Sequence, residues 1–496
     1  MPRGGNPRNV ELVNPQQSGG GFKSYGFLNP PYNLWLMATA LERLGVQARV
    51  TDEVVGDRPR FDADCLFVTT FTFSVKRALA IAREARARGV PVILGGIHAS
   101  DAYRHDRIFQ ETPKWRPPFG YFPTHFFDEL QVADSVCVGE VEPVLPAIAA
   151  DLKAHSLQPL YQGGYARRED YFPVLLPDWT ERYPLFPWQS SRGCPFDCDF
   201  CEVTRAYGKA QRTRPIEVVV QEIEYFQATR RRMSLAWNID DIMYLNPTWT
   251  RELLDAIYRR VGEFPWGGCA TTANLYRHKE DIAFLAKTGC LVLYFGFEGY
   301  SSERMKELGV SKNRVEIYRD LIRACHDNDI AVSGSVILTP DDTFETVERM
   351  VEYFHGIDAD MLSFTLLTPL LSTPVFVRYH LRGEITTFDW DQYNFSEAVL
   401  KHSRYGPAEF KELRRHAQKQ FFPTKRIVGD VGRAVMSAVR NLSHFDDITH
   451  TRGAARYVMR AGAGLRYVAP KLPAFEATSL LSTPLSWGLG HRSRGS

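Results

Sequence analysis

Residues 194–201 read Cys194-Pro195-Phe196-Asp197-Cys198-Asp199-Phe200-Cys201, which places three cysteines within eight residues in the spacing C-x3-C-x2-C. Three thiols in one loop are too close to pair with three separate disulfide partners. They are also one ligand short of a structural zinc site, which takes four protein ligands. They suit a [4Fe–4S] cluster that is held by thiolates and keeps one iron open. The nearest later cysteines, Cys269 and Cys290, come singly and are typical of buried strand residues. The spacing therefore favours an iron–sulfur cluster over zinc.

This spacing, with the aromatic Phe200 before the third cysteine, resembles the signature of the radical SAM superfamily. The run from Ser190 to Phe196 (Ser-Ser-Arg-Gly-Cys-Pro-Phe) is similar to that of members with an N-terminal cobalamin-binding domain. The resemblance implies that Cys194, Cys198 and Cys201 hold the cluster and that Phe200 packs near the adenine of S-adenosylmethionine (SAM). It also implies that the amino and carboxylate groups of SAM chelate the open iron. Reductive cleavage of SAM then yields a 5′-deoxyadenosyl radical.

The composition is that of an ordinary globular protein. Its 496 residues predict two or three domains, and a net charge of +2 gives no reason to expect a nucleic-acid partner. No apolar signal segment opens the sequence, and no apolar run reaches the length of a transmembrane helix. The cysteines form no framework of the secreted type, so we expect a cytoplasmic protein in a reducing compartment.

The first third of the chain alternates short apolar strands with helices. We expect strands at 10–13, 46–50, 64–69, 90–94 and 135–138. Helices are expected between them, one of them N-capped by Ser74. This alternation predicts an α/β fold with a Rossmann-like, doubly wound parallel sheet.

Sheets of this kind bind ligands at the carboxyl ends of their strands. Here those ends are rich in glycines, hydroxyls and polar side chains: Thr72, Ser74, Gly95, Gly96, His98, Gly139 and Glu140. Glycines let a bulky planar ligand approach the backbone, and hydroxyls supply hydrogen bonds. The same residues are equally typical of routine turns between a strand and a helix.

Residues 8–155 resemble the cobalamin-binding domains that precede radical SAM domains. The similarity lies in the strand end Asn14-Pro15, in Gly-Gly-x-His at 95–98 and in Gly-Glu-x-Glu at 139–142. It implies that the seven residues named above contact cobalamin. Two features depart from the family: Val141 replaces its usual glycine, and no Asp-x-His-x-x-Gly motif is present to supply a histidine to cobalt. His98 is therefore expected near the cofactor tail and not as a cobalt ligand.

The middle of the chain predicts a second α/β unit. Residues 156–187 are rich in proline and aromatic residues and predict a linker. Residues 188–374 contain six strand–helix units, too few for a closed eight-stranded barrel. Six units match the (β/α)6 partial TIM barrel that the radical SAM resemblance implies. The cysteine loop follows the first strand, where parallel units place functional groups.

Polar side chains also end the other strands of this unit. Asp240 and Asp241 end the second strand, where the resemblance places the SAM amino group; a charge at a helix N-terminus is the alternative. Asn274 follows the third strand and suits ribose or carboxylate. Glu298 matches the family's Gly-x-Glu, and a carboxylate that ends an apolar strand needs a partner. Leu338 departs from the family, which usually has glycine in the fifth strand.

Residues 375–476 predict a helical C-terminal region, and 477–496 predict a disordered tail. Apolar residues recur with helical spacing over 427–442, and arginines punctuate the segment that follows. A basic amphipathic helix can lie on a membrane surface, which would give peripheral membrane contact. A helix packed on the barrel with solvated arginines is the alternative.

These features predict an enzyme, a cobalamin-dependent radical SAM C-methyltransferase that acts on an unactivated carbon. The resemblance implies that the radical abstracts hydrogen, that methylcobalamin donates its methyl group and that a second SAM remethylates the cobalamin. The expected cofactors are a [4Fe–4S] cluster, SAM and cobalamin, which carry the hard chemistry. The expected partners are an external electron donor such as flavodoxin or ferredoxin and a small-molecule substrate. That substrate is a lipid, a tetrapyrrole or a secondary metabolite.

Three other functions fit the same residues. The enzyme could use both cofactors for cyclisation, rearrangement or oxidation, which a product without an added methyl group would reveal. It could be a radical SAM enzyme whose first domain has lost cobalamin, which an absorbance spectrum would reveal. It could also be a cobalamin- or iron–sulfur-binding regulator without turnover, which production of 5′-deoxyadenosine from SAM would exclude.

Overall fold

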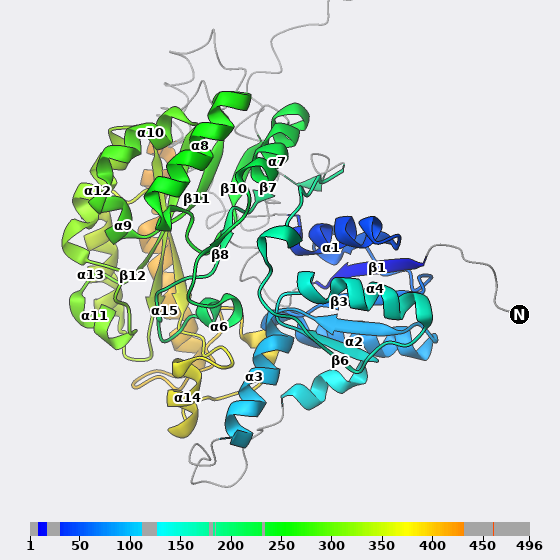
Figure 1. Cartoon of the computed structure of the whole chain (residues 1–496). Coiled ribbons are helices and arrows are strands. Elements are labelled where there is room, and N and C mark those ends of the chain that lie inside the picture. The colour runs from blue at the N-terminus through cyan, green and yellow to red at the C-terminus, as the bar shows by residue number, and fades with distance from the viewer. Residues whose placement is uncertain are drawn as a thin grey trace, which may run out of the picture.

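Two parallel six-stranded sheets follow one another along the chain in the computed structural model (Figure 1). The structure describes residues 8–16, 30–111, 126–177, 182–183, 185–230, 234–430 and 460. The predicted tail at 477–496 and most of the predicted helical stripe at 427–442 lie outside these residues. None of the described helices combines the length and the apolar character that a membrane span requires.

The first sheet has the strand order β2-β1-β3-β4-β5-β6, and all of its neighbouring strands are parallel. Its strands are β1 (Asn9–Asn14), β2 (Gln47–Asp52), β3 (Cys65–Thr69), β4 (Val92–Gly95), β5 (Ser135–Val138) and β6 (Leu160–Gln162). Its helices are α1 (Tyr32–Arg43), α2 (Val75–Ala87), α3 (Ile97–Glu111) and α4 (Leu145–Ala154). This is the predicted doubly wound sheet with one strand more, because β6 lies in the segment that the sequence analysis assigned to the linker.

Helices cover both faces of this sheet, which is why its central strands are apolar throughout. Cys65 and Phe67 of β3 pack into one core together with α1 and α4. Leu66 and Val68 pack into the opposite core together with α2 and α3.

The prediction that the Ser74 side chain caps a helix is wrong. Ser74 occupies the N-cap position of α2, but its hydroxyl caps no helix N–H group. It bonds instead to the backbone of Phe71, because a single 3-10 turn, η3 (Thr72–Ser74), precedes the helix.

The second sheet has the order β14-β13-β12-β11-β10-β7, again with parallel neighbours. Its strands are β7 (Leu185–Trp188), β10 (Leu235–Asn238), β11 (Trp266–Ala270), β12 (Cys290–Glu298), β13 (Ala331–Leu338) and β14 (Met361–Leu366). Its helices are α7 (Ile216–Thr229), α8 (Pro247–Val261), α9 (Thr272–Arg277), α10 (Ile282–Lys287), α11 (Ser302–Glu307), α12 (Tyr318–His326) and α13 (Phe344–Gly356). No described strand joins β14 to β7, so the six units form an open barrel, which confirms the predicted fold class.

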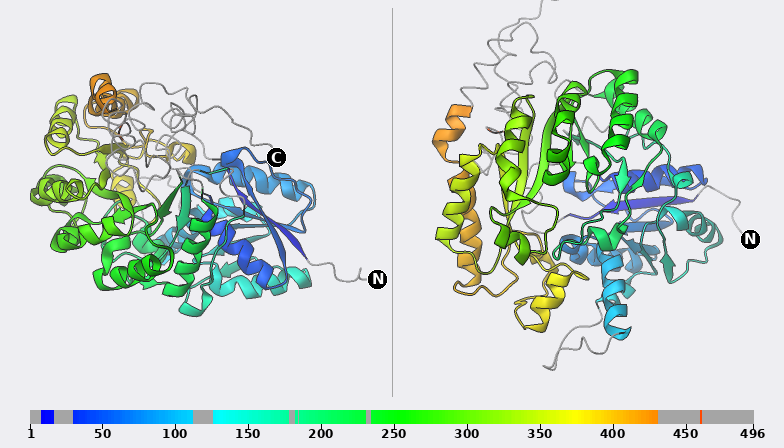
Figure 2. Two further views of the ribbon diagram at one scale, coloured as in Figure 1. Left: turned by 90° about the horizontal axis from the view of Figure 1, so that it is seen from above. Right: turned by 60° about the vertical axis from the view of Figure 1, so that its left-hand side comes forward.

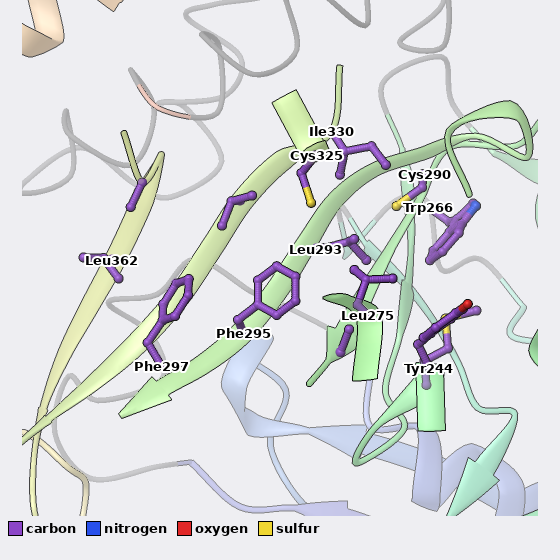
Figure 3. Close-up of a cluster of buried hydrophobic side chains, with 14 of the residues drawn as sticks. Tyr244, Trp266, Leu275, Cys290, Leu293, Phe295, Phe297, Cys325, Ile330 and Leu362 are labelled. Carbon is purple, nitrogen blue, oxygen red and sulfur yellow. The ribbon is translucent and has the colours of Figure 1, made fainter. Parts of the chain in front are cut away.

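The two faces of the second sheet differ in chemistry. Leu293, Phe295 and Phe297 of β12 lie in the large core that the outer helices cover (Figure 3). Alternate residues of a strand point to opposite faces, so Tyr294 and Gly296 lie on the inner face, where they are half-buried. Figure 2 shows α11, α12 and α13 on the side of the barrel farthest from the first sheet. The inner face is therefore available to functional groups.

The chain after β14 connects the two units. Helix α15 (Pro407–Phe421) packs on the barrel core. Phe376 of helix α14 (Pro374–Leu381) and Trp390 of the turn η11 (Trp390–Gln392) lie instead in the core of the first sheet beside α2 and α3. The C-terminal region thus contacts both units.

Candidate active site

The cysteine loop lies between β8 (Ser191–Arg192) and the short helix α6 (Val203–Tyr207). Gly193 enters it with a φ of +96°, and a Cβ there would stand 2.3 Å from the carbonyl oxygen of Ala210, so only glycine fits. The Cys194 N–H donates to the carbonyl of Gly208 at 3.1 Å. The Thr204 hydroxyl donates to the carbonyl of Phe196 at 2.7 Å. The loop is therefore held by its own backbone before any ligand binds.

All three loop cysteines are free thiols. Burial raises the pKa of Cys198 to about 11 and that of Cys201 to about 12, and it raises the pKa of Cys194 as well. The ammonium of Lys312 opposes the shift at each of them. Phe200 packs in the same small apolar cluster as Cys198 and Cys201.

This donor set fits an iron–sulfur cluster. Among the described residues, no three His, Cys, Asp or Glu side chains are placed to hold one metal ion together. Each thiolate of a [4Fe–4S] cluster binds a different iron, so its ligands stand farther apart than the ligands of one ion. Three free thiols that act on one another electrostatically are consistent with that larger group.

The carboxylate of Asp240, a predicted SAM contact, is hydrogen-bonded to other groups of the chain. It accepts hydrogen bonds from the Ser190 N–H at 2.6 Å, the Ser190 hydroxyl at 2.5 Å and the Ser191 hydroxyl at 2.7 Å. Burial raises its pKa, and these donors oppose the shift. Asp240 therefore positions the strand that leads into the cysteine loop.

The next carboxylate reaches the loop directly. Asp241 accepts a hydrogen bond from the Gly193 N–H at 3.0 Å. Burial raises its pKa to about 6, and that N–H group opposes the shift. The amide of Asn274, another predicted SAM contact, donates to the carbonyls of Tyr244 and Leu245 at 3.3 and 2.9 Å.

Glu298 ends β12 in a left-handed conformation, with a φ of +61°, which is rare outside glycine. Strained backbone of this kind gathers at functional sites. The Glu298 carboxylate lies 3.3 Å from the Lys312 ammonium. A Cβ at Gly296 would meet both groups, at 2.3 and 3.2 Å, so this glycine makes room for the ion pair.

Sequence reasoning missed Lys312. It stands in the loop Val310-Ser311-Lys312-Asn313, which reads as an ordinary polar turn. Only the fold shows that this turn folds back over the end of β12. A positive charge opposite Glu298 could have been anticipated from the need of that carboxylate for a partner, but its position in the sequence could not.

The predicted cobalamin residues meet at the carboxyl edge of the first sheet. His98 Nδ1 lies 3.2 Å from the Thr72 hydroxyl, and the ring of Trp390 packs edge-on against His98 at 5.3 Å. Burial lowers the pKa of His98 to about 3, so this histidine is neutral. A Cβ at Gly96 would stand 2.7 Å from the Thr70 carbonyl oxygen, so the turn itself requires this glycine. Gly95 lies beside it at the end of β4.

The same edge has a surface of the kind that suits a planar macrocycle. Phe71 and Phe73 are half-buried, and their rings stack in parallel with centroids 5.6 Å apart. Apolar rings at a sheet edge, next to glycine turns, can pack against the flat face of such a ligand.

Comparison with known proteins places these features in a family. The model of the radical SAM superfamily matches residues 188–354, which include the cysteine loop, Glu298 and Lys312. Residues 188–354 therefore form a radical SAM domain. Both the predicted recognition and the prediction of an enzyme are confirmed, and this domain implies a [4Fe–4S] cluster and SAM as cofactors.

The curated relatives of this radical SAM enzyme include methyltransferases. It is 25% identical over 439 residues to the bacteriochlorophyllide d C-12(1)-methyltransferase of Chlorobaculum tepidum, covering 84% of this chain and 89% of that protein. It is 23% identical to the hopanoid C-2 methylase of Rhodopseudomonas palustris, covering 69% and 62% of the two chains. It is also 23% identical to the anaerobic magnesium-protoporphyrin IX monomethyl ester cyclase of Cereibacter sphaeroides, covering 79% and 66%.

Among solved structures, the fold matches the radical SAM methyltransferase TsrM from Kitasatospora setae, solved with cobalamin and a [4Fe–4S] cluster bound. The TM-score is 0.61 at 18% identity, and the match covers 92% of this chain and 99% of that one. Both sheets therefore share their fold with one radical SAM enzyme.

The first sheet of this radical SAM enzyme is tied to the cysteine loop by buried ion pairs. Arg192, two residues before Cys194, lies 3.2 Å from Glu140 and 2.7 Å from Glu142. Arg212 also binds Glu140. The carboxylate of Glu140, a predicted cobalamin contact, thus pairs with two arginines at the junction between the two units. The neighbouring Gly139 lies close to Gly163, because a Cβ at Gly139 would stand 2.6 Å from the Gly163 carbonyl oxygen.

Proposed function

We propose that this radical SAM enzyme is a cobalamin-dependent C-methyltransferase. The observation that carries the proposal is the similarity to a curated methyltransferase over 84% of this chain and 89% of the relative, which spans both sheets. The whole-chain match to the fold of TsrM supports the pairing of a cobalamin-binding unit with a cluster-binding barrel.

In this proposal Cys194, Cys198 and Cys201 hold the cluster, which supplies the electron that cleaves SAM. We propose that Glu298, beside the Lys312 ammonium, and Asp241, beside the Gly193 N–H, bind the polar groups of SAM. Asp240 and Asn274 are reassigned from SAM contacts to positioning residues, because the chain's own groups occupy their side chains. Phe200 stays a proposed adenine neighbour.

Cobalamin is proposed to bind at the carboxyl edge of the first sheet. Gly95, Gly96 and Gly139 form the turns there, and Thr72, Ser74, His98 and Glu140 lie beside them. The neutral His98 bonds to Thr72 and stands against Trp390, which suits a residue near the cofactor and not a ligand of cobalt. The domain limits are proposed at 8–155, 156–187, 188–374 and 375–476, although β6 pairs with the first sheet and β7 with the second inside the linker range.

The inner face of the barrel favours a substrate with polar groups. Ser335 of β13 and Ser363 of β14 are half-buried there, and their strand neighbours are buried. A purely hydrocarbon substrate would leave these hydroxyls unpaired, which costs free energy. A tetrapyrrole with oxygen-bearing substituents would satisfy them, so we infer this class ahead of a lipid hydrocarbon. Flavodoxin or ferredoxin would supply the electron, and the reducing cytoplasm would preserve the free thiols.

The test is anaerobic reconstitution of the full chain with iron, sulfide, cobalamin, SAM and a low-potential reductant, followed by incubation with a chlorophyllide. We expect 5′-deoxyadenosine and a product heavier by one methyl group. SAM labelled in its methyl group should label the product, and Cys198→Ala should abolish both signals. Cleavage of SAM without methyl transfer to any chlorophyllide, hopanoid or extract component would contradict the proposal.

The similarity to a magnesium-protoporphyrin IX monomethyl ester cyclase supports a second candidate function, an oxidative or ring-forming reaction on a tetrapyrrole. The mass of the product separates the two candidates. Loss of hydrogen or gain of oxygen, without a labelled methyl group, would favour the cyclase-like reaction.

A further inference from the structure

A buried ammonium stands beside the cysteine loop. The Lys312 side chain is only 17% exposed, and its nitrogen lies 3.3 Å from the Glu298 carboxylate. Burial by itself would lower the pKa of Lys312, but Glu298 and the neighbouring thiols raise it above its ordinary value. The partners of Lys312 therefore favour the charged form of its side chain.

The loop that bears Lys312 is fixed in place. The amide of Asn313 donates to the carbonyl of Gly296 at 2.6 Å and to that of Phe297 at 3.1 Å. The Thr272 hydroxyl donates to Asn313 Oδ1 at 3.2 Å. These bonds tie the loop to the end of β12 and the start of α9, and Val310, two residues before Lys312, packs in the same apolar cluster as Cys198 and Cys201.

Lys312 acts on the thiols of Cys194, Cys198 and Cys201 together. Carboxylates oppose it at each thiol: Asp241 acts on Cys194, Glu298 and Asp197 act on Cys198, and Glu202 acts on Cys201. The influence of buried charges is strong, because solvent screens them little. One cation that reaches all three ligands also reaches any group that they hold in common.

We propose that Lys312 fixes a positive charge beside the cluster and thereby raises the reduction potential of that cluster. Reduction adds one electron and makes the cluster more negative, so a fixed cation stabilises the reduced state relative to the oxidised state. Glu298 acts in the opposite direction, and the balance of the pair sets the potential. This inference rests on the cluster assignment in the proposed function, but not on methyl transfer.

The experiment is a redox titration of the reconstituted full chain without SAM, with viologen mediators and a low-potential chemical reductant. The reduced cluster is followed by its electron paramagnetic resonance signal. Lys312→Gln removes the cation, and Glu298→Gln removes the anion. Lys306→Gln is the matched control, because it removes one positive charge from an exposed position on α11.

We expect a more negative potential in Lys312→Gln, a more positive one in Glu298→Gln and no shift in Lys306→Gln. If Lys312→Gln fails to take up iron, the sign of the Glu298→Gln shift decides alone. Unchanged potentials in variants with full iron content overturn the inference and leave the proposed function intact. Weaker SAM binding by Lys312→Gln at an unchanged potential also overturns it and assigns the ammonium to SAM. A wild-type chain that takes up no cluster contradicts the proposed function itself.

Discussion

The thiol of Cys198 is buried in a small apolar cluster with Met305, Leu308 and Ile337, where a thiol with a raised pKa is unreactive by itself. Replacing Cys198 by alanine should leave the fold intact, because a small apolar group can remain in this apolar place. It should reduce the iron content and the visible absorbance of the reconstituted protein to background, because two thiolates do not hold the cluster.

Cys269 provides the matched control for this prediction. Burial raises the pKa of Cys269 to about 12, and the nearby thiol of Cys194 contributes to the rise. Cys269 belongs to β11 and not to the cysteine loop. Cys269→Ala should keep full iron content. Equal loss of iron in both variants would show that the cluster ligands have been assigned wrongly.

At the scale of elements, Arg192 joins the strand before the cysteine loop to the end of β5. Its guanidinium is buried between Glu140 and Glu142. Arg192→Met would leave both carboxylates buried without this partner, and breaking a buried ion pair typically costs about 3–5 kcal/mol. We expect faster hydrogen exchange in β5 and in the cysteine loop, measured by mass spectrometry on the apoprotein.

Arg167→Met is the control, because Arg167 is 79% exposed and its partner Glu169 lies 3.9 Å away. Exposed pairs contribute about 0–1 kcal/mol, so this variant should exchange like the wild type. If hydrogen exchange in Arg192→Met is as slow as in the wild type, other contacts hold the junction.

Helix α3 lies beside α6 (Figure 1). Two carboxyl groups interact there, Asp101 of α3 and Glu202 just before α6. Burial raises the pKa of Asp101 to about 6, although Arg104 at 2.7 Å opposes the shift. Burial and Asp101 raise the pKa of Glu202 as well. In the unfolded chain Asp101 loses its proton at lower pH, near the ordinary pKa of a carboxyl group. Between that pH and about 6, the folded state therefore binds more protons than the unfolded state. Stability should therefore fall as the pH rises from about 4 to about 6, and it should keep falling at higher pH as long as the folded state retains the proton of Glu202.

Asp101→Asn should reduce the loss of unfolding free energy over this pH range by roughly 2–3 kcal/mol, since one pKa unit corresponds to about 1.4 kcal/mol. The measurement is thermal unfolding of the reduced apoprotein between about pH 4 and about pH 7. An unchanged slope in Asp101→Asn would show that other groups control the pH dependence.

The elements also show how far the sequence could predict the site. The alternation of strands and helices predicted both sheets, because buried parallel strands are apolar throughout. The cysteine loop was expected directly after the first barrel strand, but the short strand β8, which pairs with β9 in a separate sheet, lies between β7 and the loop. Asp240 was chosen for its place at a strand end, but the hydroxyls that occupy its carboxylate come from residues fifty positions earlier. Lys312 could not be found, since nothing local distinguishes it from a surface lysine.

At the scale of the whole molecule, the chain crosses between the two units several times. The first sheet precedes the barrel, α1 packs against the barrel core, and the segment after β14 returns to the first sheet. Tyr32 of α1 bonds to Glu222 of α7, and Glu222 in turn pairs with Arg214 at 2.7 Å. Because these contacts are buried and come from several segments, we expect the two sheets to unfold as one cooperative unit.

The segment after β14, which returns to the first sheet, gives a test of this cooperativity. Trp390 is 2% exposed and packs on His98, Phe126 and Tyr393. Trp390→Ala should cost about 3–5 kcal/mol through the cavity it leaves. In calorimetry we expect one unfolding transition for the wild type and two for Trp390→Ala, since the first sheet would lose its link to the C-terminal region. Leu381→Ala, at a position 38% exposed on α14, should keep one transition at nearly the wild-type temperature. Two transitions in the wild type would show that the sheets unfold independently and that Trp390 contributes only to local packing.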